Sequence, residues 1–358
     1  MKREKLEKLA TEKNSPCVTI SLNTHRNYPE NQKDSILLKE LLLDARERVI
    51  QVYGKRSVSD LIEKIDQIEK EIDMDYNLDS IHIFLSNSTK EIIKSTWPTV
   101  KNIVHVSENF AVKPLIKILN RTSEYMILTL TKSEVRLLLA VNDGIVGEIK
   151  NDDFPFTKTQ DDSTDTETIT NGKQAENQVK EYFNKIDKAV VRVNNTTDMK
   201  CVVVCTEDNY NLLMKLADKP TVYLGWTTIN YDKTLNHSIA NDAWSVVKIQ
   251  QKKGRADDIK EMQEAIGKGN VITELSEIYQ AAKEGRGDLL IVNDNFHQAV
   301  RVTGEFSLDL VTDLTLPGVI DDITSEIAWN VISMKGRAIF TTQEELKSLG
   351  DIALKVRY

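Results

Sequence analysis

The sequence predicts a multidomain α/β protein, and three observations lead to that prediction. The chain has 358 residues, more than one ordinary hydrophobic core accommodates. Short apolar runs of strand composition alternate with longer segments whose apolar residues recur at helical spacing. No stretch of about 18 uninterrupted apolar residues, the length needed to cross a membrane, is present. We therefore expect three α/β domains, at about residues 1–120, 121–250 and 251–358.

The first third of the chain predicts a small α/β domain. CVTISL at 17–22 and SIHIFLS at 80–86 have strand composition. Between them, apolar residues from Leu38 to Val52 recur every three or four positions, which predicts a helix that ends at Gly54. A second helix is predicted from Ser57, with Asp60 three residues on in a capping-box arrangement.

The middle third predicts a mixed sheet flanked by helices. EYMILTLT, EVRLLLAV and GIVGEIK predict three antiparallel strands, because the Asp-Gly pair at 143–144 is a hairpin signal. A long loop rich in Asp and Thr follows at 151–174, and such loops are typically functional or disordered. A helix, the strand CVVVC, a second helix and the strand TVYLGW then complete the alternation.

The last third predicts a small α/β/α sandwich. It begins after QQKKGRADD at 250–258, a polar segment that we expect to be a hinge. Helices are predicted at 256–266, 274–284 and 322–334, and strands at GDLLIV and RAIFTT. Residues 293–319 show no period and are expected to form a long connection.

Composition and missing motifs exclude several classes of protein. A net charge of −8 disfavours a general RNA binder that grips phosphates, although a local basic patch remains compatible with it. The sparse cysteines, Cys17, Cys201 and Cys205, argue against a disulfide framework, and the five scattered histidines lack ligand spacing. No metal and no cofactor is predicted. P-loop, dinucleotide and nucleophile-elbow motifs are missing.

A two-metal nuclease and a secreted protein are also disfavoured. The carboxylates near the ends of the three middle strands are expected to form a solvated rim instead of a metal cluster; they are Glu124, Glu134, Asp143 and Glu148. The N-terminal segment MKREKLEKLATEKN lacks the apolar centre of a signal peptide. We expect a cytoplasmic protein without a membrane segment.

One short motif stands at the end of the long loop, immediately before a predicted helix. Gly172 lies beside polar residues in Asn171-Gly172-Lys173-Gln174. A glycine there lets the backbone approach a ligand closely, and a helix N-terminus favours phosphate or a developing oxyanion. The alternative is an ordinary turn followed by an N-cap, and spacing alone favours that turn.

Four segments together resemble the bacterial archaeo-eukaryotic release factor family. SLNTHRN, with the helix KDSILLKELLLDARERV after it, is similar to the opening of that family. Its later segments are similar to FAVKPLIKILNRTSEYMILTLTKSEVRLL, to RADDIKEMQEAIGKGNVITELSEIYQAAKEGRGDLLIV and to the ending DDITSEIAWNVISMKGRAIFTTQEEL. The segments span nearly the whole chain in the family's order.

The resemblance implies a layout shared with archaeo-eukaryotic release factors and Pelota. The middle domain would be ribonuclease-H-like, and the C-terminal α/β/α sandwich would be like the kink-turn-binding ribosomal proteins. In release factors the equivalent loop carries Gly-Gly-Gln, whose glutamine positions the water that hydrolyses peptidyl-tRNA. Gly172 and Gln174 would then be the catalytic pair. Hydrolysis by positioning needs no side-chain nucleophile, which agrees with the missing triad.

This chain departs from the family motif, so two functions stay open. Lys173 stands where the second glycine would be, and a Cβ at a residue that needs positive φ costs about 1–2 kcal/mol. Lys173 would instead hold tRNA phosphates. The protein is thus expected to act in translation or ribosome rescue, as a peptidyl-tRNA hydrolase or as a non-catalytic ribosome-, RNA- or protein-binding scaffold.

The resemblance also implies partners and RNA contacts. The expected partners are the ribosome and tRNA, with a translational GTPase as a further one. His25 and Arg26, in SLNTHRN, and Lys113, in FAVKPL, match family segments and are candidates for RNA contact. His25 is equally compatible with a structural role in the loop after the first strand.

Overall fold

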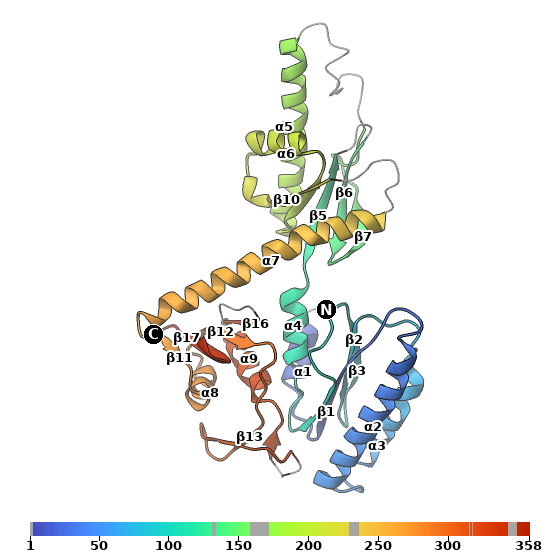
Figure 1. Ribbon diagram of the computed structural model, residues 1–358, viewed down its shortest axis with the longest axis vertical. Helices are drawn as coiled ribbons and strands as arrows, with labels where there is room; N and C mark the ends of the chain where they lie inside the picture. Colours follow the sequence, from blue (N-terminus) through green and yellow to red (C-terminus); the bar gives the residue numbers. More distant parts are fainter. Residues whose placement is uncertain are drawn as a thin grey trace. The chain divides into compact units, whose positions relative to one another are not determined.

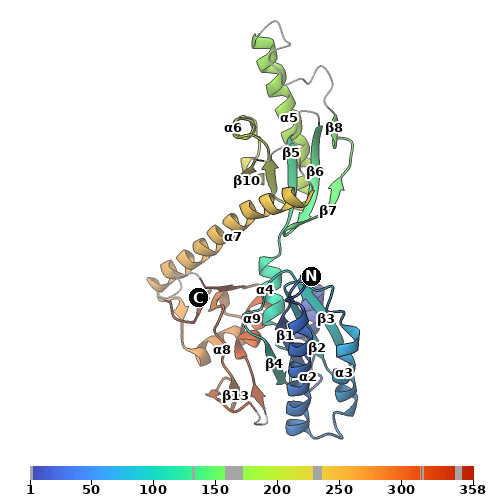
Figure 2. The same ribbon diagram turned by 45° about the vertical axis from the view of Figure 1, so that its right-hand side comes forward.

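The protein is a mixed α/β molecule with several sheets, as the sequence predicts. The computed structural model describes residues 3–130, 134–157, 172–228, 236–314, 316, 318–342 and 349–358 (Figures 1 and 2). The chain forms two compact units, one made of residues 1–121 with 255–358 and the other of residues 122–254. We call these the composite unit and the middle unit. The predicted three-domain boundaries stay a prediction.

The N-terminal part of the composite unit is an antiparallel sheet with helices on both faces. Its strand order is β3 (Lys90–Ser95), β2 (Ser80–Leu85), β1 (Cys17–Asn23) and β4 (Ile103–Ser107). Alternate residues of β1, such as Val18 and Ile20, pack against α2 (Gln32–Tyr53) and α3 (Ser59–Glu71). The opposite face packs against α1 (Arg3–Ala10) and α4 (Lys113–Arg121). Both central strands are therefore buried on two sides.

The C-terminal part of the composite unit is the predicted α/β/α sandwich. Its sheet has the order β11 (Val271–Ile272), β17 (Ile352–Val356), β12 (Gly287–Asn293) and β16 (Arg337–Thr341). Helices α8 (Leu275–Lys283) and α9 (Ile323–Ser333) cover one face. The other face packs against the end of α7 (Asn236–Ile266) through Ile259 and Met262. The prediction of a three-layer sandwich is confirmed.

The middle unit has the topology that the family resemblance implies. Its sheet runs β10 (Tyr223–Thr227), β9 (Cys201–Val204), β5 (Glu124–Leu130), β6 (Glu134–Val141) and β7 (Gly144–Ile149), with β8 (Phe156–Thr157) paired to β6. The first three strands along the chain are antiparallel, and β9 and β10 continue parallel to β5. This arrangement is the ribonuclease-H-like sheet that was expected.

Helices cover both faces of the middle sheet (Figure 1). On one face, Met126 and Leu128 of β5 pack with α5 (Gly172–Thr197) and α6 (Glu207–Leu216). On the other face, the ring of Tyr125 stacks on Trp244 of α7, with 6.3 Å between ring centroids. The alternation of β5 side chains thus supplies two cores from one strand.

Three local predictions are wrong. Ser57 does not cap α3, because its hydroxyl donates to the carbonyls of Tyr53 and Gly54, and Val58 is the residue at the N-cap. The expected hinge at 250–258 lies inside the continuous helix α7. The expected connection at 293–319 contains a small sheet of three short strands, β14 (Leu308–Leu310), β13 (Val300–Val302) and β15 (Val319–Ile320).

Among the described residues, no helix is both long and apolar enough to cross a lipid bilayer.

Candidate functional site

The Gly172-Lys173-Gln174 motif lies where α5 begins. The helix starts at Gly172, so the three residues form its first turn. The preceding loop, residues 158–171, lies outside the described residues, and so do the side chains of 172–176. The structure thus shows where the motif lies in the order of helices and strands.

The apolar face of α5 begins well after the motif. Tyr182 is the first residue of the helix with a buried side chain in the described part, and Phe183 and Ile186 follow it into the core. Gln174 and Tyr182 are eight positions apart, which in an α-helix is about 12 Å along the axis. The residue one turn after the motif, Asn177, is exposed. The buried stretch from Tyr182 onward therefore anchors the helix on the sheet, and the motif sits about two turns beyond that anchor.

His25 and Arg26 lie in the loop after β1, and each is held by a carboxylate. His25 donates its backbone N–H to Asp34 Oδ2 at 2.6 Å, and its Nδ1 lies 2.8 Å from Asp34 Oδ1. Arg26 makes a two-point contact with Asp79, at 2.8 Å and 2.9 Å. The side chain of Asp34 is only 2% exposed, while that of His25 is 52% exposed. These contacts hold the loop against α2 and β2 and leave the imidazole at the surface.

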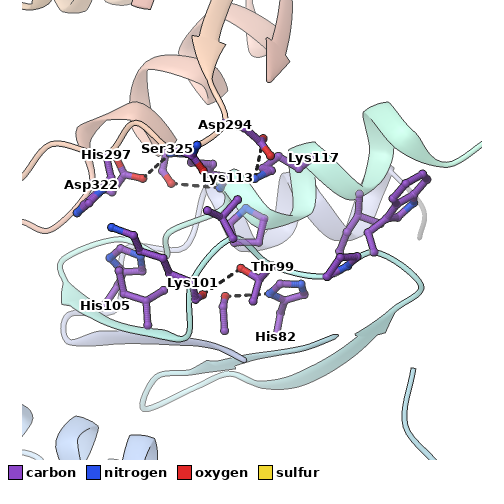
Figure 3. A pocket seen from close by; sticks show the side chains of 18 of the residues that line it. His82, Thr99, Lys101, His105, Lys113, Lys117, Asp294, His297, Asp322 and Ser325 are labelled. Carbon is purple, nitrogen blue, oxygen red and sulfur yellow. Dashed lines mark hydrogen bonds and ion pairs between the residues drawn. The ribbon is translucent and has the colours of Figure 1, made fainter. Parts of the chain in front are cut away.

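Lys113 lies far from His25 in the chain and lines a pocket within the composite unit. The pocket encloses about 700 Å³, part of it open to solvent. It is bounded by α4, by the segment between β3 and β4, by residues 294–297 after β12, and by the start of α9. Figure 3 shows Lys113 and Lys117 on α4 near Asp294, Asp322 and Ser325, with Thr99 and Lys101 on another wall.

Lys113 joins α4 to the C-terminal part of the unit. Its Nζ lies 3.2 Å from Asp322 Oδ2 and donates to the carbonyl of Phe296, and its backbone N–H donates to Ser325 Oγ at 3.1 Å. The residue is 8% exposed. Asp322 is also the N-cap of α9, because its Oδ1 accepts from Thr324 N at 3.1 Å. The predicted RNA contact of Lys113 is thus a buried cation committed to two elements of its own unit.

Two further cations of α4 share one carboxylate. Lys117 Nζ lies 2.7 Å from Asp294 Oδ1, and Arg121 Nη2 donates to Asp294 Oδ2 at 2.9 Å. Burial alone would raise the pKa of the Asp294 carboxyl, but the two cations hold that pKa below its usual value. Burial lowers the pKa of the Lys117 ammonium, Asp294 opposes this, and the charges of Arg121 and Lys113 add to it. The cluster is therefore richer in positive than in negative charge.

Two of the histidines that line the pocket, His82 and His105, are buried and neutral. Burial, with the charge of Lys117, lowers the pKa of His82 to about 4. Its Nδ1 lies 2.8 Å from Ser21 Oγ and its Nε2 lies 3.1 Å from Ser80 Oγ, so both ring nitrogens are occupied by hydroxyls. Burial likewise lowers the pKa of His105, although Asp322 and Asp321 act in the opposite direction. The positive charge of the pocket comes from lysine and arginine.

Sequence reasoning found one residue of this pocket, Lys113, and missed the others. A signal was available for two of them, because Lys113, Lys117 and Arg121 recur every four positions and so share one face of a helix. Their acidic partners, Asp294 and Asp322, come from a segment more than 170 residues away. No sequence pattern links the two sets.

The chain matches one family model. Residues 124–286 match the bacterial archaeo-eukaryotic release factor family 3. The matched range contains nearly all of the middle unit, including Gly172-Lys173-Gln174, and continues through α7 and α8. No curated protein matches the chain.

Several solved structures of translation factors are similar in fold. A structure of ribosome-bound archaeal Pelota and ABCE1 is 17% identical with a TM-score of 0.43, and the likeness covers 78% of this chain and 72% of that one. S. cerevisiae Dom34, a translation termination-like factor, is 15% identical with a TM-score of 0.41, covering 76% and 75%. The archaeal translation termination factor aRF1 is 12% identical with a TM-score of 0.25, covering 99% and 96%.

At these sequence identities and TM-scores, the likeness concerns the fold and does not indicate an activity. The family match is independent of it and agrees with the segments quoted from the sequence. The resemblance is thereby confirmed over residues 124–286, which match the model of family 3 of the bacterial archaeo-eukaryotic release factors.

Proposed function

We propose that the protein acts at the ribosome as a release-factor-like protein whose middle unit reaches peptidyl-tRNA. The observation that supports this most is the family match over residues 124–286, which contains the Gly172-Lys173-Gln174 motif. In this proposal Gln174 positions a water for attack on the ester that joins peptide to tRNA, and Gly172 lets the backbone approach. Such chemistry relies on placement of the water and needs no side-chain nucleophile.

The positions of the buried residues of α5 fit a helix that presents its first turn to a binding partner such as tRNA. The anchoring side chains start at Tyr182, so the motif lies about 12 Å along the helix from the first fully buried contact. The N–H groups of the first turn have no acceptor within an α-helix, and the helix dipole adds partial positive charge there. Lys173 adds a full charge at the same end, which suits the phosphates of tRNA.

A second candidate function is supported by Lys173 itself. Where the family motif has its second glycine, this chain has a long side chain, which would occupy the space of the attacking water. The protein would then bind the ribosome, RNA or another protein through the same surfaces without hydrolysis. His25 and Arg26, on the loop after β1, are the RNA contacts that we propose outside the middle unit. Lys113 is less suited to that role, because its ammonium is engaged within its own unit.

The partners that we propose for this chain are those of similar solved structures. The archaeal Pelota structure is ribosome-bound and includes ABCE1, and Dom34 interacts with Hbs1. We propose the ribosome and tRNA as partners of this chain, with a translational GTPase as a further one, and the cytoplasm as its location.

Peptide release from ribosomes that hold labelled peptidyl-tRNA separates the two functions. If the protein is a hydrolase, release exceeds buffer, and Gln174→Ala lowers the rate by about 100-fold, equivalent to about 2.7 kcal/mol of transition-state stabilisation. Gln178→Ala is the matched control, since it removes the same side chain one turn further along α5. Lys173→Gly restores the family motif and is expected to raise the rate. Release equal to buffer for every variant leaves the scaffold function.

Co-sedimentation with ribosomes in a sucrose gradient tests both functions at once. Binding is expected at low salt and is expected to weaken as salt rises, because phosphate contacts release counterions. A protein that stays at the top of the gradient at low salt would contradict the hydrolase and the scaffold alike.

A further inference from the structure

The pocket of the composite unit has a composition that neither proposed function uses. Four cationic side chains line it, Lys101, Lys113, Lys117 and Arg121, and they face two carboxylates, Asp294 and Asp322. Asp322 is matched by Lys113, while Asp294 is shared by Lys117 and Arg121. Lys101 is exposed and forms no ion pair with a residue that the structure describes. With His82 and His105 neutral, the lysine, arginine and aspartate side chains of the lining carry an excess of two positive charges.

This excess is local and runs against the charge of the whole chain, which is −8. A partly enclosed site with unbalanced positive charge attracts an anion, because its low-dielectric walls concentrate the field.

The remaining walls of the pocket are apolar and partly aromatic. They are formed by Trp97, Pro98, Val100, Pro114, Ile118 and Phe296. The guanidinium of Arg121 lies over the ring of Trp97, with 5.6 Å between its central carbon and the ring centroid. This pair places a cation beside a flat apolar surface, an arrangement on which nucleobases stack.

From these features we infer that the pocket binds a nucleoside monophosphate, as a free nucleotide or as the 5′-phosphorylated terminal nucleotide of an RNA chain. A phosphate monoester carries close to two negative charges at neutral pH, which matches the excess in the lining. Its base would lie on the apolar wall beside Trp97, and its phosphate would lie among Lys101, Lys117 and Arg121. The hydroxyl of Thr99 supplies a polar group for the sugar.

Isothermal titration calorimetry of the full chain at low salt tests the inference. The probes are AMP and CMP, with adenosine and inorganic phosphate as the two halves of the ligand. The nucleotides are expected to bind with a Kd below about 1 mM, which corresponds to about −4.1 kcal/mol. Adenosine and phosphate are each expected to bind at least tenfold more weakly, because each lacks one of the two recognised groups.

Variants locate the binding site. Lys101→Ala is expected to weaken AMP binding about tenfold without loss of folding, because Lys101 is exposed and makes no ion pair in the described part. Trp97→Leu is expected to weaken AMP more than it weakens phosphate, since it removes the stacking surface. Lys55→Ala, another exposed lysine, lies outside the lining and serves as the matched control.

Competition with a 5′-phosphorylated single-stranded RNA tetranucleotide distinguishes the two sources of the ligand. Displacement of AMP by this RNA supports an RNA nucleotide as occupant, and AMP binding that resists the RNA supports a free nucleotide. No nucleotide binding below about 1 mM overturns the inference, and so does AMP binding that Lys101→Ala leaves unchanged. The pocket belongs to the composite unit, so these outcomes do not depend on release activity of the middle unit.

Discussion

Replacing Asp321 is expected to weaken the attachment between the N-terminal and C-terminal parts of the composite unit. Asp321 Oδ2 accepts from Arg48 Nη2 at 2.6 Å and from the backbone N–H of Val106 at 3.1 Å. His105 Nδ1 lies 3.8 Å from the same oxygen. The side chains of Arg48 and Asp321 are 13% and 3% exposed. One carboxylate thus joins α2 and β4 to the residue pair that precedes α9.

The magnitude follows from what each substitution leaves behind. Asp321→Ala leaves the mostly buried guanidinium of Arg48 with the carbonyl of Val104, at 2.8 Å, as its remaining partner among the described residues. It also leaves the backbone N–H of Val106 without its acceptor. Removing one member of a buried ion pair typically costs about 3–5 kcal/mol. Asp321→Asn keeps an acceptor in place and is expected to cost about 1.5–3 kcal/mol.

Hydrogen exchange followed by mass spectrometry at rising urea concentration measures this effect region by region. The opening free energy of α2 and α9 amides is expected to fall by about 3–5 kcal/mol in Asp321→Ala, while that of β5 in the middle unit is unchanged. Asp66→Asn is the control, because its pair with Arg46 is 3.4 Å long and exposed, and such pairs contribute at most about 1 kcal/mol. A loss under about 1 kcal/mol in Asp321→Ala would refute the reasoning.

Two further predictions concern packing and pH. Gly336→Ala is expected to destabilise the composite unit by about 1–3 kcal/mol, because a Cβ would lie 2.6 Å from Val331 Cγ1 and 2.8 Å from the carbonyl oxygen of Gly287. Gly254→Ala lies inside α7 with no atom within 4 Å of the added Cβ, so it is expected to stabilise the protein by about 0.5–1 kcal/mol. Equal melting temperatures for the two variants would contradict this difference. Because the pKa of His82 is about 4 in the folded chain against 6.5 as its ordinary value, the unfolded chain binds the extra proton first as pH falls. Stability is therefore lost between pH 6.5 and pH 4, by about 2 kcal/mol at pH 5 relative to pH 7. The free energy of unfolding of His82→Asn, measured in urea, should lack this pH-dependent contribution. The same pH dependence in both proteins would show that the contribution comes from another group.

Hydrophobic periodicity predicted the longer elements well. The spacing from Leu38 to Val49 placed α2, and Gly54 follows it with φ of 77°, as a helix-ending glycine should. The hairpin between β6 and β7 was visible in the Asn142-Asp143-Gly144 turn, where Asn142 has a φ of 52°. Such elements are specified locally, because their side chains repeat the period of the structure that buries them.

Elements that depend on distant contacts were not predicted. The segment 250–258 is polar and contains Gly254, so its composition resembles a hinge, yet α7 passes through it unbroken. Gln, Lys and Arg are good helix formers, and the segment is flanked within the helix by the buried residues Trp244 and Ile259. Strands β13, β14 and β15 are two or three residues long, too short to show a period.

The two candidate sites show the same contrast between features specified locally and features that depend on distant contacts. The motif from Gly172 to Gln174 is contiguous, so the sequence shows it and the family match includes it. The pocket is assembled from segments far apart in the chain, such as Lys117 and Asp294, and only the fold brings these together. The excess of positive charge could not be read from a chain whose total charge is negative.

The central claim is that the first turn of α5 reaches the end of a peptidyl-tRNA on the ribosome, and a cross-link tests it most directly. Lys173→Cys can carry a thiol-linked photoreactive probe selectively, because Cys17, Cys201 and Cys205 are buried. On ribosomes that hold labelled peptidyl-tRNA, the account predicts a cross-link from position 173 to the 3′ end of that tRNA. A probe at Lys55, in the composite unit, should give none. Cross-links from position 173 that reach only this chain, or equal labelling from both positions, would contradict the account.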